Sequence, residues 1–363
     1  MEQIAVIGLG FGDEGKGRVV DYLCSTREDS LVIRFSGGQQ AGHTVVREGV
    51  RHVFSNFGSG TLLGVPTYIS RFCTVDPIGI IKEMRKLHDS GITPRLYIDE
   101  RCPVTTPYEK ILNKQLDYDN GTVGVGVGPT WQREEDYFSL VFSDIYYPSV
   151  MDIKLSMIRK YYGLSVDLDD FLNAVNEIVK ANNVFSSPYI PSGDYDDMIF
   201  EGSQGLMLDK NIGFFPHVTR SNVGLQNILQ LTPVISKVYF VTRAYQTRHG
   251  NGPMTNEHIP HFIYPNPNET NVLNKFQGQF RRTLLDVDLL KYALRRGESR
   301  HYNSTLVITC MDHIVDDMRF THGGEVWSFN SEDDFVKGIS DVLGIRNVLL
   351  SRGDSGPLEQ FKG

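Results

Sequence analysis

The sequence predicts an α/β fold in which helices cover both faces of a mainly parallel central sheet. Short apolar runs rich in β-branched residues recur along the chain, and many are continuous, as expected of strands buried on both faces. Helical patterns separate some of these runs, and strands that alternate with helices favour a parallel sheet. The first run leads directly into a glycine-rich turn, which predicts a P-loop-like phosphate loop after the first strand.

The individual elements follow from the local pattern. Helices are expected where apolar residues recur at helical spacing, at 77–88, 166–181 and 286–295. Strands are expected at 4–7, 31–35, 67–69, 96–98, 198–200, 238–241, 305–309 and 347–350.

Composition narrows the class of protein. The chain has 363 residues and a formal net charge of 36 − 44 = −8, so a non-specific nucleic-acid surface is not expected and any phosphate is met by local groups. The four cysteines lie far apart, which favours free thiols over zinc binding or a disulfide scaffold. The first residues lack the basic region of a signal peptide, and no apolar run approaches the roughly 18 residues of a membrane span. We therefore expect a cytoplasmic protein without a membrane partner.

The stretch GLGFGDEGKGRVVDYL at 8–23 fits two phosphate-binding patterns. As G-x-G-x-x-G it would bind a dinucleotide, but the second predicted strand ends in Gly37-Gly38 and lacks the acidic residue that holds the ribose. As G-x-x-x-x-G-K it is a P-loop, although Gly17 stands where Ser or Thr normally binds magnesium. Asp13 is then the nearest hard oxygen ligand for Mg²⁺; alternatively, it only caps the following helix.

A second glycine-rich block, SGGQQAGHT at 36–44, follows the second predicted strand. It places His43 in a turn close to the candidate phosphate loop. A histidine in such a turn can act as a general acid or donate a hydrogen bond to phosphate, although a lone histidine is more often structural.

Several blocks in order along the chain resemble the adenylosuccinate synthetase family. They are GDEGKG at 12–17, GGQQAGHT at 37–44, GVGVGP at 124–129, FEGSQGLMLD at 200–209, FPHVTRSN at 215–222, RAYQTRHGNGP at 243–253 and a weaker pair of arginines at 281–282. The resemblance implies a single domain over 1–363 with inserted sub-domains, and a homodimer.

The resemblance also implies a ligase reaction. Members of the family join L-aspartate to C6 of a 6-oxopurine nucleotide, after a nucleoside triphosphate has phosphorylated O6. By family position, Asp13, His43 and Gln204 are the catalytic residues, and Mg²⁺ is held by Asp13 and the Gly42 carbonyl. Asp13 would take the N1 proton, His43 would be a general acid at O6, and Lys16 would neutralise the triphosphate.

The remaining site residues are assigned by the same resemblance. The donor triphosphate would contact Gly12, Glu14, Gly15, Lys16, Gly17, Gly42, Thr44 and Asp312. The acceptor nucleotide would contact Asp13, Gln40, Thr122, Gln204, Thr219 and Gln279. Arg281 would hold the aspartate carboxylate, where a guanidinium forms two parallel hydrogen bonds. Loop packing remains an alternative for Gln204 and Thr219, and a solvated basic pair remains one for Arg281-Arg282.

The residues that differ from the family pattern occur mainly at positions that contact the nucleotides. Val123 and Val125 replace a phosphate-binding hydroxyl and an arginine, and Cys310 replaces the lysine that packs on guanine. Gln279 stands where an arginine faces the ribose, and Gln40 replaces an asparagine. The segment 134–138 lacks the arginine that reaches a neighbouring subunit's nucleotide.

These departures resemble the phage branch of the family, the 2-aminoadenylosuccinate synthetases. The resemblance implies dGMP as acceptor and ATP or dATP as donor, with a product that leads to 2-aminoadenine in phage DNA. Some phage members lack an acid at the position of Asp13, which this chain keeps. The alternatives are a standard enzyme that uses IMP and GTP in purine biosynthesis, and an inactive nucleotide-binding relative.

Overall fold

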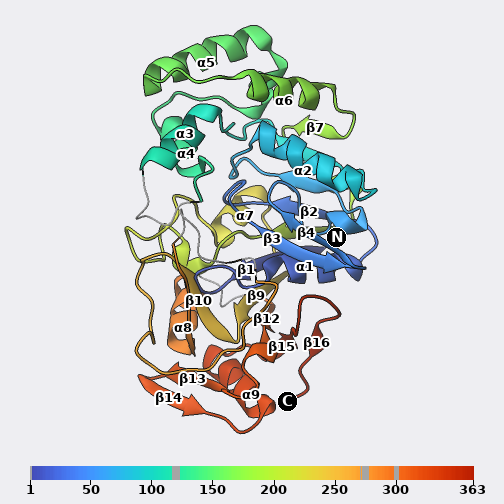
Figure 1. Ribbon diagram of the computed structural model, residues 1–363. Helices are drawn as coiled ribbons and strands as arrows, with labels where there is room; N and C mark the ends of the chain where they lie inside the picture. The colour runs from blue at the N-terminus through green and yellow to red at the C-terminus, as the bar shows by residue number, and fades with distance from the viewer. Residues whose placement is uncertain (1, 117–122, 270, 272–277, 298–301) are drawn as a thin grey trace.

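The computed structural model describes residues 2–116, 123–269, 271, 278–297 and 302–363. Its centre is a ten-stranded sheet in the order β16-β15-β12-β9-β1-β8-β2-β5-β6-β7 (Figure 1). All neighbouring strands pair in parallel except β16, which runs antiparallel to β15 at one edge. The bounds are β1 Glu2–Gly8, β2 Ser30–Arg34, β5 Thr67–Ile69, β6 Leu96–Asp99, β7 Val184–Ser187, β8 Asp197–Glu201, β9 Lys237–Arg243, β12 Ser304–Thr309, β15 Asn347–Leu350 and β16 Glu359–Gln360.

The predicted fold class is confirmed, and each of the predicted strands lies in this sheet. Alternate residues of β1 pack on opposite faces. Ile4 and Val6 join the cluster around Val19 and Leu23 of α1, whereas Ala5 and Ile7 join the cluster that contains α7, α8 and α9. Because both faces of the strand are covered by helices, its apolar run is continuous rather than alternating.

Helices surround the sheet and extend the molecule at both ends (Figure 1). Their bounds are α1 Lys16–Ser25, α2 Pro77–Asp89, α3 Pro107–Leu116, α4 Val127–Glu135, α5 Pro148–Tyr162, α6 Asp169–Lys180, α7 Leu225–Leu231, α8 Val287–Arg296 and α9 Glu332–Leu343. The three predicted helices correspond to α2, α6 and α8. Helices α2, α5 and α6 pack with β5, β6 and β7 in a separate apolar cluster.

Several helix ends follow from local sequence. Pro77 occupies the first turn of α2, where its missing N–H costs no hydrogen bond. The Asp286 side chain accepts from the Leu289 N–H at the start of α8, and Ser331 accepts from the Asp334 N–H at the start of α9. No helix in the described ranges is long and apolar enough to cross a membrane.

Two smaller sheets complete the structure. The first contains β10 Tyr245–His249, β11 Phe280–Asp286, β13 Arg319–His322 and β14 Glu325–Ser328 in that order, and the second is the hairpin of β3 His43–Arg47 and β4 Val50–Phe54. Single 3₁₀ turns lie at Thr61–Leu63, Phe142–Tyr146, Ser192–Asp194, Leu206–Leu208 and Met311–His313.

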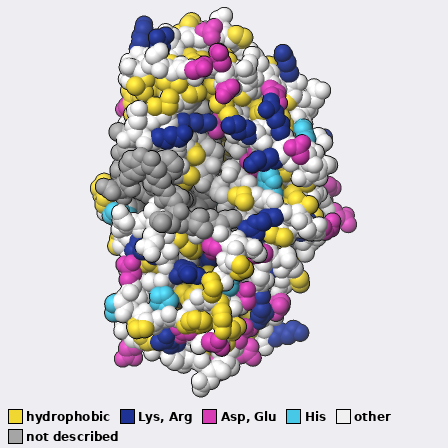
Figure 2. Space-filling view, viewed as in Figure 1, with side chains coloured by type: hydrophobic (Ala, Val, Ile, Leu, Met, Phe, Trp, Pro, Cys, Tyr) yellow, Lys and Arg dark blue, Asp and Glu magenta, His cyan; other side chains and the backbone are white. Residues whose placement is uncertain are grey.

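An apolar stripe runs along the exposed side of α5 and its N-cap residue, between charged residues such as Asp152 and Lys160. Tyr147, Val150, Ile153 and Met157 are exposed at helical spacing. Hydrophobic side chains also gather in the upper part of the molecule in Figure 2, where α5 lies. This stripe has no covering element among the described residues.

The sheet order determines which loops meet. The strands β15, β12, β9, β1, β8 and β2 are consecutive and parallel, so their carboxyl ends lie along one edge. In open α/β sheets, ligands bind outside that edge. The phosphate loop follows β1 and the GGQQAGHT block follows β2, so both blocks lie at this edge.

Candidate active site

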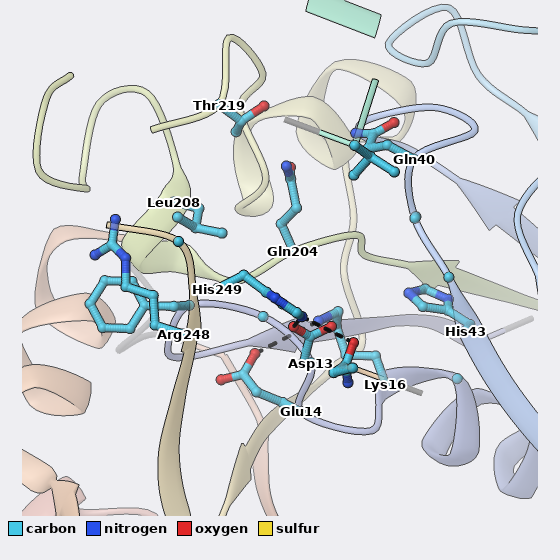
Figure 3. A pocket seen from close by; sticks show the side chains of 18 of the residues that line it. Asp13, Glu14, Lys16, Gln40, His43, Gln204, Leu208, Thr219, Arg248 and His249 are labelled. Atoms are coloured by element: carbon cyan, nitrogen blue, oxygen red, sulfur yellow. Dashed lines mark hydrogen bonds and ion pairs between the residues drawn. The ribbon is translucent and has the colours of Figure 1, made fainter. Parts of the chain in front are cut away.

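A cavity of about 730 Å³ lies at the carboxyl ends of these strands. Figure 3 shows Asp13, Lys16, His43, Gln204 and Thr219 around it, on loops that are far apart in the sequence. All the sequence-predicted site residues from Gly12 to Gly17, from Gln40 to Thr44, and Gln204 and Thr219 line it.

The phosphate loop is held open by left-handed backbone conformations. Gly12 has a φ of 89° and Gly15 a φ of 85°. The φ of Gly15 favours glycine, and a Cβ there would also lie a tight 3.2 Å from Thr309 Cγ2. Asp13, at a φ of 57°, adopts this conformation with a short polar side chain that tolerates it.

Glu14 turns inward and braces the loop. Its Oε1 accepts from the Gly10 N–H at 2.5 Å, and its carbonyl accepts from the Thr309 hydroxyl at 2.9 Å. Burial raises the pKa of Glu14 to about 7, although Lys16, whose Nζ lies 3.7 Å from Glu14 Oε2, opposes the shift. Lys16, the residue that the resemblance assigns to the triphosphate, is therefore held in the loop beside the buried carboxyl group of Glu14.

The Asp13 carboxylate faces the cavity. Its side chain is 30% exposed, and His249 Nε2 lies 3.6 Å from Oδ2. The backbone of Asp13 is also held in place, because Arg243 Nε donates to the Asp13 carbonyl at 2.5 Å. The carboxylate oxygens thus remain accessible to a ligand.

His43 is oriented by a buried carboxylate. Its Nδ1 lies 2.5 Å from Oε1 of Glu201, the last residue of β8. Burial lowers the pKa of His43, and Glu201 opposes that shift. Burial alone would raise the pKa of Glu201, but His43, Arg34 and the Ser59 hydroxyl hold it at about 2. With Nδ1 fixed on Glu201, the imidazole has only Nε2 free for a ligand.

Two glutamine side chains have unpaired acceptors at the cavity. Oε1 of Gln40 and Oε1 of Gln204 are buried without a hydrogen-bond donor. Both residues line the cavity with Thr219, and Gln204 has a φ of 57° that turns it inward (Figure 3). Buried polar atoms without a partner are rare, so these oxygens indicate a ligand with hydrogen-bond donors.

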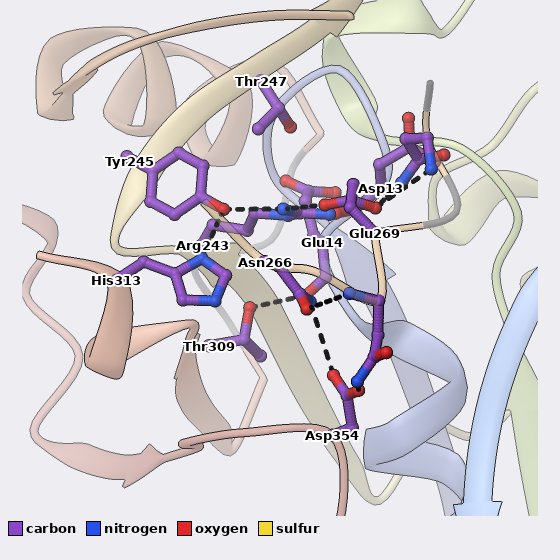
Figure 4. A network of polar contacts seen from close by, with 12 residues as sticks. Asp13, Glu14, Arg243, Tyr245, Thr247, Asn266, Glu269, Thr309, His313 and Asp354 are labelled. Carbon is purple, nitrogen blue, oxygen red and sulfur yellow. Dashed lines mark hydrogen bonds and ion pairs between the residues drawn. The ribbon is translucent and has the colours of Figure 1, made fainter. Parts of the chain in front are cut away.

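A polar network closes the other side of the cavity (Figure 4). Arg243 Nη1 donates to the Tyr245 hydroxyl at 2.7 Å and to Glu269 Oε2 at 2.9 Å. Tyr245 in turn contacts His313 Nδ1 at 2.8 Å. The network ties the end of β9 to a loop that lines the cavity, and that loop also carries Asn266 and Asn268.

The wall formed by the GVGVGP block is apolar. Val123, Val125 and Val127 line the cavity, together with Leu112 and Tyr162 from α3 and α5. The loop is fixed from behind. Gln39 Nε2 donates to the Val125 carbonyl at 3.0 Å, and the Gly126 N–H donates to Asn113 Oδ1 at 2.9 Å.

Some expected site residues lie elsewhere. Gln279 is exposed and Asp312 lies outside the cavity lining, and Asp312 Oδ2 is 3.7 Å from His313 Nε2. Arg281 also lies outside the lining: its Nη1 donates to Glu257 Oε1 at 2.6 Å, and its Nη2 donates to the carbonyl of Gly252, which does line it. Thr122 lies outside the described residues.

Sequence reasoning missed several residues at the site. Glu201, Arg243, Arg248 and His249 carry contacts there, and Arg220 lines the cavity beside Thr219. Each lies inside a block that resembled the family, so the blocks contained the signal.

The residues of the site can hold Mg²⁺ when a bound nucleotide supplies further oxygen ligands. No group of three or more His, Cys, Asp and Glu side chains that could hold a metal occurs in the described part of the chain. Asp13 supplies one accessible carboxylate and Gly42 a backbone carbonyl at the same cavity. Magnesium commonly binds one or two carboxylates and completes its shell with phosphate oxygens and water. The donor set therefore fits that mode.

A phosphate loop after β1, an oriented histidine and a carboxylate at one cavity define a nucleotide-binding enzyme. Known proteins specify the class further. A family model described as adenylosuccinate synthetase matches residues 5–319. The chain belongs to the adenylosuccinate synthetase family, whose members are C–N bond-forming ligases.

Curated relatives agree with the family model. The adenylosuccinate synthetase of Buchnera aphidicola subsp. Schizaphis graminum is 30% identical over 345 residues, which cover 87% of this chain and 78% of the relative. That of Deinococcus radiodurans is 30% identical over 320 residues, 81% and 77% of the two chains. That of Bordetella avium is 30% identical over 289 residues, 70% of this chain and 65% of the relative.

Two solved structures share the fold. Fully ligated adenylosuccinate synthetase from Plasmodium falciparum has a TM-score of 0.81 at 18% identity, covering 99% of both chains. Succinoaminodeoxyadenylate synthetase of cyanophage S-2L, bound to dGMP and dATP, has a TM-score of 0.70 at 14% identity, covering 100% of this chain and 96% of the other.

Proposed function

We propose that this ligase joins L-aspartate to C6 of dGMP with ATP or dATP as the energy donor. The observation that carries the proposal is the apolar wall of Val123 and Val125 in the same cavity as Asp13, His43 and Gln204. The reactive groups of the family are kept, while two positions that the resemblance assigns to nucleotide binding, Val123 and Val125, are changed.

In the first step, O6 of the purine attacks the γ-phosphorus of the triphosphate and the nucleoside diphosphate leaves. Asp13 would accept the N1 proton, which lets the oxygen develop negative charge. Lys16 and the N–H groups of the phosphate loop would bind the phosphates. When bound by Asp13 and the Gly42 carbonyl, Mg²⁺ supplies positive charge to the phosphates.

In the second step, the aspartate amine attacks C6 and inorganic phosphate leaves with the former O6. His43 Nε2 would donate a proton to that oxygen, since Nδ1 is occupied by Glu201. The free acceptors of Gln204 and Gln40 would receive donors of the acceptor nucleotide. Together these residues assist loss of an oxygen that is otherwise a poor leaving group.

The aspartate substrate would bind where two arginines face each other. Arg248 and Arg281 are cross-strand partners on β10 and β11. Burial and the neighbouring Arg281 lower the pKa of Arg248 to about 10, and Glu257, which pairs with Arg281, opposes that shift. We propose that Arg281 leaves Glu257 and binds a carboxylate of L-aspartate at the edge formed by Gly252.

The choice of donor would depend on the end of β12. Cys310, at a φ of 58°, lines the cavity, and by the resemblance it replaces the family's lysine, whose stem packs on guanine. Without that stem, selection for guanine is weakened, which supports ATP or dATP. We propose that Gln279, which is exposed in this structure and stands in place of a ribose-facing arginine, faces an acceptor without a 2′-hydroxyl. We further propose that Asp312 contacts the base of the donor and that Thr122 contacts the acceptor.

A standard reaction with IMP and GTP is the second candidate. Retention of Asp13 favours it, because some phage members lack an acid there and thereby make room for the guanine 2-amino group. The two candidates share all catalytic residues and differ only in nucleotide selection.

A crossed turnover assay separates them. Protein, Mg²⁺ and L-aspartate are held constant while dGMP or IMP is combined with ATP, dATP or GTP, and the succinylated product is followed by mass. We expect product with dGMP and ATP or dATP. Product with IMP and GTP alone would establish the second candidate, and no product in any combination would identify an inactive relative.

The biological setting follows from the same proposal. A product with a 2-amino group would supply 2-aminoadenine for phage DNA, made in the host cytoplasm. We also propose a homodimer, for which the exposed apolar stripe of α5 offers a contact surface (Figure 2).

A further inference from the structure

Arg220 is one of the arginines that line the cavity. It follows Thr219 directly, and both residues line the cavity. Its Nη1 donates to Oε2 of Glu135 at 3.0 Å, and Glu135 is the last residue of α4. The two side chains are 49% and 58% exposed.

This ion pair holds Arg220 only weakly. Solvated pairs contribute little, because water screens the charges and both side chains lose freedom. A guanidinium also carries five N–H donors, of which Glu135 uses one. A phosphate group with several oxygens can accept paired hydrogen bonds from such a side chain.

The neighbouring acids do not compete for Arg220. Glu134 accepts from Arg133 at 2.8 Å, and Asp136 accepts from the Tyr161 hydroxyl at 2.5 Å. Glu135 is the carboxylate on this segment that contacts Arg220.

The other cations that line the cavity each contact at least one protein group, although Nε of Arg248 has no hydrogen-bond partner. Lys16 belongs to the phosphate loop beside Glu14. Arg18, Arg51, Arg243 and Arg248 each donate to backbone carbonyls: of Ser355, Asn268, Asp13 and Pro253 respectively. Among the described arginines that line the cavity, Arg220 is the one that donates its hydrogen bond to an exposed side chain, that of Glu135.

We propose that Arg220 binds the 5′-phosphate of the acceptor nucleotide within its own chain. The proposal rests on the proposed ligase function but not on which purine is used. Segment 134–138 contains no arginine that could reach a neighbouring subunit, and here its Glu135 contacts Arg220. The guanidinium exchanges Glu135 for the phosphate, or bridges both, when the nucleotide enters beside Thr219.

The first test is direct binding by calorimetry. Arg220→Ala should weaken binding of dGMP, and of IMP where the protein binds it, by about 10- to 100-fold, as expected for a lost charge-assisted hydrogen bond. Arg220→Lys should recover part of the affinity, because it restores the charge without the paired donors. Glu135→Gln should leave the affinity unchanged or raise it by a few fold.

The matched control is Arg85→Ala. Arg85 pairs with Glu177 at 2.6 Å on the surface, with exposures of 64% and 41%, and neither residue lines the cavity. The Arg85→Ala variant should therefore bind the nucleotides as the wild type does. Unchanged binding in Arg220→Ala would overturn the inference whichever purine the enzyme uses. Wild-type protein that binds neither monophosphate would overturn the proposed function as well.

Kinetics and subunit mixing test the role and the chain of origin. In Arg220→Ala, the KM of the monophosphate should rise, while the KM values of L-aspartate and the triphosphate stay unchanged. Mixing inactive Asp13→Ala with Arg220→Ala at low monophosphate should restore no activity, because each complete site needs both residues in one chain. Restored activity would show that Arg220 serves the partner subunit and would overturn the assignment.

Discussion

Glu201→Gln tests how the buried carboxylate supports both stability and catalysis. Glu201 is fully buried and accepts from Ser59 N at 3.1 Å, from the Ser59 hydroxyl and from His43. Its pKa falls from 4.5 to about 2 on folding, because His43, Arg34 and Ser59 outweigh the effect of burial. At about 1.4 kcal/mol for each pKa unit, the ionised group stabilises the fold by about 3 kcal/mol.

The sign of the pH dependence follows from the lowered pKa. The stabilisation is present in full above pH 4.5 and is lost as the pH falls towards 2. Glutamine has no charge to lose, so the stability gap between wild type and Glu201→Gln should be largest above pH 4.5 and should shrink by up to about 3 kcal/mol as the pH falls through 4.5 to 2 and below. Urea unfolding followed by circular dichroism at several pH values measures that gap.

The same substitution should affect turnover. Without the carboxylate, nothing fixes the tautomer and ring of His43, and orienting carboxylates of this type contribute at least about 100-fold to kcat. A stability gap that stays constant from pH 7 to pH 3, or a kcat within about threefold of wild type, would refute the role assigned to Glu201.

Four further outcomes are expected. Asp13→Ala should abolish turnover while the melting temperature stays within a few degrees of wild type; normal turnover would contradict its role. His43→Asn should lower kcat by about 10²- to 10⁴-fold, and an unchanged rate in a steady-state assay would make His43 structural. Arg133→Gln should destabilise the fold by about 3–5 kcal/mol in urea, because Arg133 and Glu109 form a fully buried ion pair at 2.6 Å; a loss below 1 kcal/mol would contradict this. Chelation of Mg²⁺ should stop turnover and added Mg²⁺ should restore it, whereas turnover that persists in chelator would exclude a metal requirement.

The central sheet was predictable because burial on both faces leaves continuous apolar runs. The second sheet was not, because its strands carry polar and charged residues. The strand β10 reads YQTRH and the start of β11 reads FRR, and these side chains serve the cavity and its surroundings. In these strands, polar and charged residues replace the apolar residues from which a strand is recognised in a sequence.

The site residues that could be predicted are those that lie together in a short sequence motif. The phosphate loop and His43 lie in short glycine-rich blocks with their own signature. Glu201 contacts His43 across 158 positions, and Arg243 contacts the Asp13 carbonyl across 230. Such partners follow only from strand order, since β8 and β9 flank β1.

The same strand order explains how a nucleotide preference can change without a change of fold. Asp13, Glu201, Arg243 and Thr309 stand at strand ends or in the turn after β1, where the parallel sheet fixes their positions. Val123, Cys310, Arg220 and Gln279 stand in loops or turns with no partner strand to preserve. A substitution in the first set disturbs contacts between strands, whereas one in the second set leaves the strand pairing intact, although Cys310 also packs against the core and Arg220 pairs with Glu135. We therefore expect exchanges at Val123 and Cys310 to alter KM and nucleotide preference with little loss of stability. A crossed nucleotide assay combined with urea unfolding of the same variants tests this separation, and unfolding losses of several kcal/mol at both positions would contradict it.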